Sequence, residues 1–181
     1  MKKRVLFDHG GGEGAYEEDK RMAASLPGVL GAAYDVRCPK MPNEDNPEYE
    51  AWKDRIAREI AALDGEVILV GHSLGASILL KYLCEEKVEK PLAGMFSIAA
   101  PYWGAEDWQV SEYALQENLA SNRPNKLPMF FYHSRDDEWV PFEHLALYAE
   151  KFPQATVREF DGRGHQFNDD LSEVARDIGR L

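Results

Sequence analysis

The sequence predicts an α/β protein, a three-layer α/β/α sandwich in which helices cover both faces of a six-stranded parallel sheet. Two observations carry this prediction. Strand-like runs alternate with helical ones along the chain, which is the pattern of repeated strand–helix units. The run Val67–Val70 is apolar at every position, as in a strand buried on both faces. With 181 residues, 44% of them hydrophobic, the chain is long enough for one substantial core. We therefore expect a single domain over residues 1–181.

Six segments have the composition of strands. In chain order they are Arg4–His9, Tyr34–Cys38, Glu66–Val70, Ala93–Ala99, Met129–His133 and Thr156–Asp161. Three further segments carry apolar residues at helical spacings of three and four. We expect these helices to begin at Asn46 and Pro47, at Pro141, and at Asn168 or Asp169. Their apolar faces are Tyr49, Trp52, Ile56, Ile60 and Leu63; Phe142, Leu145, Ala149 and Phe152; and Leu171, Val174, Ala175 and Ile178.

The pattern Gly71-His72-Ser73-Leu74-Gly75 stands where the third expected strand becomes a helix. A serine on such a sharp turn projects its hydroxyl above the sheet, which is the geometry of a nucleophile elbow. Gly71 and Gly75 have a steric reason to be glycine, because the residues two before and two after the serine come too close together for side chains. An ordinary Gly-Ser turn is the alternative. We predict that Ser73 is a catalytic nucleophile.

A serine hydroxyl needs a base, and the base needs an acid that holds its tautomer. The chain supplies carboxylates at Asp136 and Asp137 after the fifth strand and His165 after the sixth, with Asp161 as a third candidate acid. Open α/β sheets bind ligands at the carboxyl ends of their strands, where these loops lie. His165 is preferred because its glycine-flanked loop can bring it over the sheet. His72 is expected to be a structural neighbour of the site. The histidines set aside as the base are His9, His72, His133 and His144.

Acyl transfer creates an oxyanion that needs preorganised N–H donors. The elbow supplies the backbone N–H of Leu74. We expect the second donor in the loop after the first strand, at Gly11 and Gly12, because His9 followed by glycines matches an HGGG-type motif. The alternative is a phosphate-binding loop over Gly10–Gly14. Its G-x-G-x-x-G spacing and its ribose-binding acid are not convincingly present.

On these motifs the chain resembles the α/β-hydrolase fold family over essentially its whole length. Its small size, its glycine loop and its S-x-D-D-x-x-V-P sequence followed by G-H look most like the compact serine hydrolases related to retinoblastoma-binding protein nine and to YdeN. The resemblance implies the strand order 2-1-3-4-5-6, without the leading antiparallel strands or the large cap domain of larger members. It implies Asp137 as the acid, because in this family the acid is commonly followed by two residues and then by Val-Pro. In this chain Val140 and Pro141 stand at that spacing after Asp137. It also implies hydrolysis of carboxylic esters or related acyl compounds, with no metal or organic cofactor.

Two classes of function stay open, an enzyme and a protein-interaction module on a hydrolase scaffold. The set Ser73, Asp137 and His165 favours the enzyme. Among enzymes, an esterase is preferred over an amidase or peptidase and over a thioesterase. The connection 101–126 is too short for a deep enclosed tunnel, so we expect a small-molecule substrate with a short acyl group. This connection contains the aromatic residues Tyr102, Trp103 and Trp108. They either line a small apolar pocket or pack onto the sheet.

The chain is acidic, with 21 Lys and Arg against 32 Asp and Glu and a net charge of −11. This charge repels nucleic acid and anionic membrane surfaces, and we attribute it to solubility. No stretch is apolar enough for a membrane span or a signal peptide. Cys38 and Cys84 are too few for a disulfide framework. We therefore expect a cytoplasmic protein that binds neither nucleic acid nor membrane. No motif indicates a metal or nucleotide site.

Overall fold

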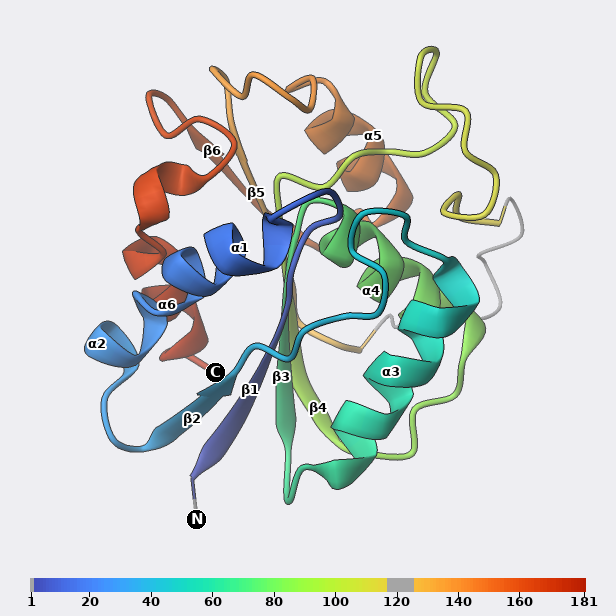
Figure 1. Cartoon of the computed structure of the whole chain (residues 1–181). Coiled ribbons are helices and arrows are strands. Elements are labelled where there is room, and N and C mark those ends of the chain that lie inside the picture. The colour runs from blue at the N-terminus through green and yellow to red at the C-terminus, as the bar shows by residue number, and fades with distance from the viewer. Residues whose placement is uncertain (1, 117–125) are drawn as a thin grey trace.

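Each of the first five strands is followed by a connection that returns the chain to the same end of the sheet, so all neighbouring strands run parallel, as Figure 1 shows. The computed structural model describes residues 2–116 and 126–181. Its strands are β1 (Lys3–Asp8), β2 (Tyr34–Arg37), β3 (Val67–His72), β4 (Leu92–Ile98), β5 (Met129–Ser134) and β6 (Thr156–Phe160). Its helices are α1 (Ala15–Ala23), α2 (Leu26–Leu30), α3 (Tyr49–Ala62), α4 (Leu74–Glu85), α5 (His144–Lys151) and α6 (Ser172–Ile178).

The six strands form one sheet in the order β2-β1-β3-β4-β5-β6. The expected α/β sandwich and its strand order are confirmed, and every expected strand is found within two residues at each end. Because the strands are parallel, their carboxyl ends meet at one edge of the sheet. The loops that follow β1, β3, β5 and β6 therefore come together there.

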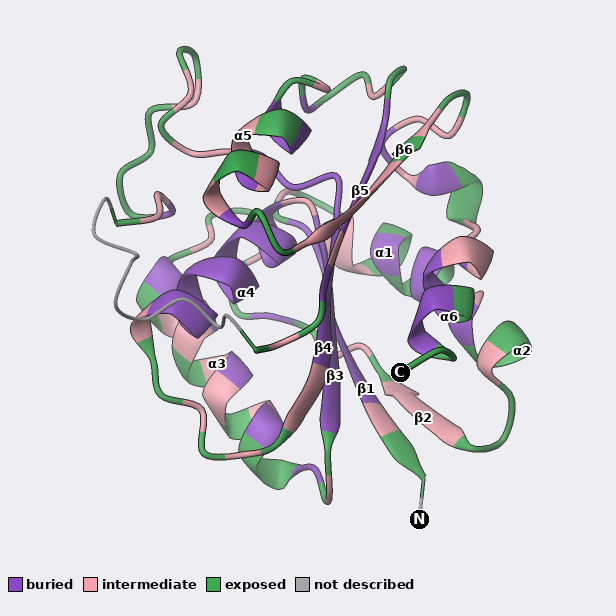
Figure 2. Ribbon diagram, turned by 180° about the vertical axis from the view of Figure 1, so that it is seen from behind, coloured by how far each residue is buried: buried purple, intermediate pink, exposed green. Residues whose placement is uncertain are grey.

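The centre of the sheet is buried on both faces. All six residues of β3 are buried, which explains its unbroken apolar sequence, and Figure 2 shows this strand buried along its length. Leu69 packs with the core under α3, α4 and α5, whereas Ile68 and Val70 pack with the core under α1, α2 and α6. A rigid central strand is thus available to hold the turn that follows it.

Three helices begin later than the sequence predicts. Helix α3 begins at Tyr49 because the residue before it is extended, with φ −116° and ψ 127°. The carbonyls of residues 141–143 each accept the N–H three residues further on, which is a tighter turn than an α-helix, so α5 begins only at His144. The backbone at Asn168 and Asp169 is left-handed, with φ of 53° at both, which cannot start a right-handed helix, and α6 begins at Ser172.

The long connection after β4 contains turns and no helix in residues 101–116. The remainder of the expected segment, residues 117–125, lies outside the described residues. Within the described ranges, no helix is long and apolar enough to cross a membrane.

Two glycines allow the tight turn from β3 into α4. A Cβ atom on Gly71 would lie 2.6 Å from Cα of Ala76 in α4. A Cβ atom on Gly75 would lie 2.5 Å from the carbonyl oxygen of Asp8, at the end of β1. Both contacts are with backbone atoms that cannot rotate away, so glycine is required at each position.

We expect Gly75→Ala to lower the free energy of unfolding by about 3 kcal/mol, the upper end of the cost of overpacking, because the clash is with backbone. Gly28→Ala is the matched control. Gly28 lies in α2 with nothing within 4 Å of an added Cβ, so alanine there should be neutral or stabilise by about 0.5–1 kcal/mol. Urea denaturation measures both. Equal stabilities of the two variants would contradict the packing argument.

Candidate active site

Ser73 is the single residue between β3 and α4, and its backbone is strained. Its φ of 52° and ψ of −125° lie where residues with side chains are rarely found. The Ser73 N–H donates to the carbonyl of Ile98, at the end of β4, over 2.9 Å. This bond and the glycine contacts hold the turn, and Ser73 lines a pocket at the carboxyl edge of the sheet.

Asp137 lies in the loop after β5, and its side chain is fully buried. Its Oδ1 accepts the backbone N–H groups of Trp139 (2.9 Å) and Val140 (2.8 Å). Its Oδ2 lies 2.8 Å from Nδ1 of His165. Burial raises the pKa of Asp137, but hydrogen bonds from two histidines and a backbone N–H outweigh burial, and the pKa lies well below its usual range. Asp137 is therefore an ionised carboxylate bonded to the His165 ring.

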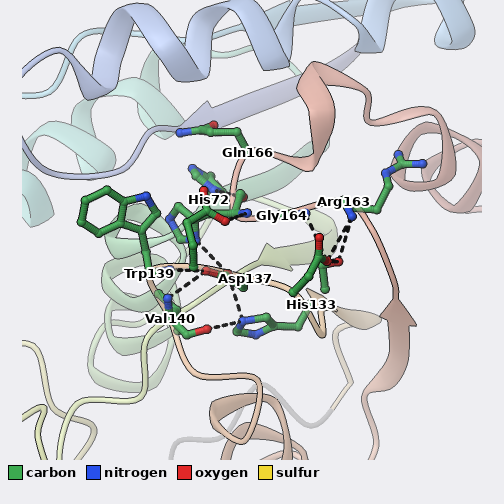
Figure 3. Close-up of polar contacts among 12 residues, drawn as sticks. His72, His133, Asp137, Trp139, Val140, Arg163, Gly164 and Gln166 are labelled. Atoms are coloured by element: carbon green, nitrogen blue, oxygen red, sulfur yellow. Dashed lines mark hydrogen bonds and ion pairs between the residues drawn. The ribbon is translucent and has the colours of Figure 1, made fainter.

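A second histidine, His133 in β5, contacts the same carboxylate. Its Nε2 lies 3.1 Å from Oδ2 of Asp137 and 3.0 Å from the carbonyl oxygen of Val140. Both partners are acceptors, so we assign the ring proton to Nε2, which donates to them. Figure 3 shows His133, Asp137 and Val140 joined by these contacts. Sequence analysis placed His133 in a strand and missed this contact, because no local pattern marks it.

Asp136 contacts the loop that leads to His165 and not the His165 ring. Its Oδ1 accepts two backbone N–H groups just before His165, over 3.2 and 3.3 Å. Asp161 is exposed and forms an ion pair with an arginine at 3.1 Å. Of the three candidate acids, the structure brings Asp137 alone to the His165 ring.

His165 lies in the loop after β6 and is only 7% exposed. Burial lowers its pKa, the bond to Asp137 raises it, and the charge of His72 lowers it; the net pKa is below the ordinary value. His165 is therefore neutral at pH 7, which is the form that a general base must have. Because Nδ1 faces Asp137 and carries the proton, Nε2 is the basic nitrogen.

The glycine loop after β1 meets the start of α4 at the same pocket. A Cβ atom on Gly11 would lie 2.6 Å from Cδ2 of Leu74, so the Leu74 side chain packs directly against the glycine loop. The Leu74 N–H belongs to the first turn of α4 and has no partner inside the helix. In residues 2–116 and 126–181 the Gly11 N–H has no acceptor. The Gly12 N–H donates to the carbonyl of Glu44 over 2.6 Å, so Gly11 and not Gly12 offers an open donor.

The pocket that Ser73 and His165 share has a volume of about 600 Å³. Three aromatic residues of the connection after β4 form one wall, with the ring centroid of Trp103 5.2 Å from that of Trp108 and 4.9 Å from that of Tyr113. Trp103 and Trp108 thus lie where sequence analysis allowed a pocket wall, and Tyr113 is an addition.

Two aromatic residues differ from the sequence-based expectation. Tyr102 does not line the pocket, because its ring packs edge-on against Tyr148 of α5, with centroids 5.0 Å apart. Trp139, which sequence analysis did not single out, lines the pocket and is 71% exposed. Its place two residues after Asp137 was the available signal.

The buried Asp19 of α1 was also missed. Its Oδ2 accepts the Gly10 N–H over 2.7 Å and lies 2.8 Å from Nδ1 of His72. Nothing in the sequence distinguishes Asp19 from the acidic residues beside it in α1. In the described part of the chain, no group of three or more His, Cys, Asp or Glu side chains is arranged to hold a metal ion.

A parallel sheet with a strained serine after its central strand, and a carboxylate–histidine pair at the same edge, defines a hydrolase of the α/β-hydrolase fold. The chain belongs to the Serine hydrolase family, whose model matches residues 27–171. This match confirms the class of compact serine hydrolases that the sequence motifs indicated.

Solved structures share the fold. The meta-cleavage product hydrolase CumD has a TM-score of 0.78 at 15% identity, covering 100% of this chain and 92% of that one. The ydeN gene product of B. subtilis has a TM-score of 0.72 at 19% identity, covering 99% and 98%. A putative YdeN-like hydrolase from Pectobacterium atrosepticum has a TM-score of 0.69 at 15% identity, covering 98% and 90%.

The curated relatives are more similar in sequence but much longer. The lysosomal phospholipase A and acyltransferase of Rattus norvegicus is 31% identical over 105 residues. The match covers 56% of this chain and 23% of the relative, and the Mus musculus protein of the same name gives the same values. The chain thus spans less than a quarter of the length of these relatives.

We expect the His165 imidazole to titrate below its ordinary pKa of 6.5, because burial and the nearby His72 disfavour its charged form. Asp137→Asn removes a charge that raises this pKa, so the midpoint should fall further. Asp136→Asn is the matched control and should leave the midpoint nearly unchanged. NMR titration of the imidazole resonances measures all three proteins. A midpoint at or above 6.5 in the unaltered protein, or equal shifts in the two variants, would show that these charges do not govern His165.

Proposed function

We propose that this hydrolase cleaves small carboxylic esters with Ser73 as nucleophile, His165 as general base and acid, and Asp137 as the residue that orients His165. The observation that carries the proposal is the 2.8 Å contact between Asp137 and His165 at a pocket that Ser73 also lines. Asp137 keeps the imidazole proton on Nδ1, which leaves Nε2 free to accept the serine proton.

In the first half of the proposed reaction, Ser73 Oγ attacks the acyl carbon while His165 Nε2 takes its proton. The substrate carbonyl oxygen becomes an oxyanion, to which the N–H groups of Leu74 and Gly11 donate. This intermediate collapses, the alcohol leaves with the proton from Nε2, and the acyl group stays on Ser73. In the second half, water gives a proton to Nε2 as it attacks the acyl group. The carboxylic acid then leaves, and the proton returns to Ser73.

One finding favours an enzyme over an interaction module, and a second favours an esterase among enzymes. The lowered pKa of His165 supports an enzyme over an interaction module, because shifted titration in a pocket is a common property of active sites and a docking surface has no need of it. The name of the curated relatives, lysosomal phospholipase A and acyltransferase, supports acyl esters over amides and thioesters. Amidase, peptidase and thioesterase activities are the remaining candidates within the enzyme class.

The pocket wall supports short acyl groups. Trp103 packs against both Trp108 and Tyr113, and all three line the pocket. Trp139 also lines the pocket and is largely exposed. Packed rings of this kind limit how far an acyl chain extends before it leaves the apolar surface.

The test of the nucleophile is Ser73→Ala. A fluorophosphonate probe should label the unaltered protein and fail to label this variant, and turnover of nitrophenyl butyrate should fall by at least about a thousandfold, leaving only the catalysis that the oxyanion donors and binding provide. Ser111→Ala, an exposed serine in a turn, is the control and should behave as the unaltered protein. Labelling or near-full turnover of Ser73→Ala would overturn the assignment. No labelling of the unaltered protein would favour the interaction module.

The test of the substrate is a series of nitrophenyl esters. We expect kcat/KM to rise with acyl length while each methylene is buried, by about 0.8 kcal/mol per methylene, and to fall beyond about six carbons. A kcat/KM that continues to rise to long chains, or activation at a lipid interface, would point instead to the lipid substrates in the name of the curated relatives.

A further inference from the structure

A second carboxylate–histidine pair lies at the buried side of the same pocket and has no part in the proposed steps. Asp19 belongs to α1 and His72 ends β3, and Oδ2 of Asp19 is 2.8 Å from Nδ1 of His72. Each side chain is only 1% exposed. Figure 3 shows His72 among the residues of the site, and its ring centroid is 4.7 Å from that of His165.

Both ring nitrogens of His72 face acceptors. Nδ1 faces the Asp19 carboxylate, and Nε2 lies 3.0 Å from the backbone carbonyl oxygen of His165. A carbonyl oxygen can only accept, so a proton is assigned to Nε2, and the carboxylate calls for a second proton on Nδ1. Burial lowers the pKa of His72, but the Asp19 charge and these hydrogen bonds outweigh it and raise the pKa above its ordinary value. The pair is therefore an imidazolium and a carboxylate.

The pair connects three segments that are remote in sequence. Asp19 Oδ2 also accepts the N–H of Gly10 over 2.7 Å, which fixes the glycine loop. His72 precedes Ser73 directly and bonds the main chain of His165. A Cβ atom on Gly10 would lie 3.3 Å from Cβ of Ser73, so the glycine loop and the elbow are in contact. One buried ion pair thus joins the loop of the proposed oxyanion donor, the nucleophile turn and the histidine loop.

Stability alone does not account for this pair. Removing two charges from water is costly, and apolar residues of similar volume in the same place are often equally stabilising or more so. What the pair supplies, and apolar packing does not, is directed hydrogen bonds to Gly10 and to the carbonyl of His165.

We propose that Asp19 and His72 are positioning residues, which hold the His165 loop and the glycine loop in register with Ser73 and place a fixed positive charge beside the His165 ring. This inference rests on the proposed function, because the positions that it concerns are those of the proposed reaction.

The fixed charge has a consequence for pH dependence. The titratable groups that face His165 are Asp137 and Glu138 from the loop after β5, Asp19 from α1 and His72 from β3. Among them, the charge of His72 lowers the pKa of His165 by more than the charge of Asp19 raises it. The neutral base is the active form, so kcat/KM is lost as the pH falls through the His165 pKa. Removing the His72 charge raises that pKa and moves the acidic limb to higher pH.

The experiment uses the full chain with His72→Gln and Asp19→Asn, each normalised to the fraction that a fluorophosphonate probe labels. We expect kcat to fall about ten- to a hundredfold with KM nearly unchanged, because the loss is in alignment and not in binding. The acidic limb of kcat/KM should move to higher pH in both variants. If Asp19→Asn does not fold, His72→Gln alone carries the test.

Asp177→Asn is the matched control. Asp177 of α6 is a buried carboxylate in an ion pair with Arg158 of β6, and neither residue lines the pocket. Its loss should lower stability without changing the normalised kcat or the acidic limb. A purely structural role of Asp19 and His72 predicts the same result for their variants.

NMR of the imidazole nitrogens gives a second readout that does not depend on turnover. At pH 7 we expect protons on both nitrogens of His72 and on one nitrogen of His165, and a His72 that becomes neutral in Asp19→Asn. A normalised kcat within twofold of the unaltered protein and an unmoved limb would overturn the proposal, as would a neutral His72 at pH 7. If the unaltered protein neither labels nor turns over esters, the proposed function fails and the positioning role fails with it, whereas the charge beside His165 is still decided by NMR.

Discussion

The close approach of α4 to the end of β1 is the constraint on which the rest of this site depends. Gly75 lies so close to the carbonyl of Asp8 that a methyl group does not fit. This contact keeps the first turn of α4 directly beside the glycine loop that leaves β1. It also forces the connecting residue, Ser73, into a backbone conformation that is costly for serine. The fully buried β3 makes this strain tolerable, because its neighbours on both sides hold the strand in place.

The ring centroids of His72 and His165 lie 4.7 Å apart, and each ring is bonded to an aspartate. Nevertheless, we assign His72 as a cation and His165 as neutral. The difference comes from the second ring nitrogen. In His72 it meets a backbone carbonyl, which requires a proton there, so the ring is cationic. In His165, Nδ1 donates its proton to the Asp137 carboxylate, which leaves Nε2 as the basic nitrogen. Burial, and after it the charge of His72, lower the pKa of His165 and favour its neutral form, so the surroundings that the fold provides set the chemistry of both rings.

The features that were predicted from sequence are local or follow from topology. The G-x-S-x-G turn needs only the residues around Ser73, and parallel strands must bring the loops of Asp137 and His165 to one edge. The features that were missed depend on contacts between distant segments. Asp19 is one of several acidic residues in α1, and His133 is one of several polar residues in strands, until the fold places Asp19 beside His72 and His133 beside Asp137. The late starts of α3, α5 and α6 have a different, local cause, since an extended residue, turn bonds and left-handed residues override the apolar spacing.

The acidic composition of the chain extends to the residues that line the pocket. Among the described residues that line it, Glu13, Glu18 and Asp19 are acidic, the charge of His72 offsets that of Asp19, and none is Lys or Arg. In the proposed reaction a neutral ester enters the pocket and a negatively charged carboxylate leaves it. The acidic side chains repel this product and not the substrate. Glu13 and Glu18 are exposed and screened by salt, which makes the repulsion modest. Its sign nonetheless favours release of the acid product over its retention, and a net charge first attributed to solubility also acts at the site.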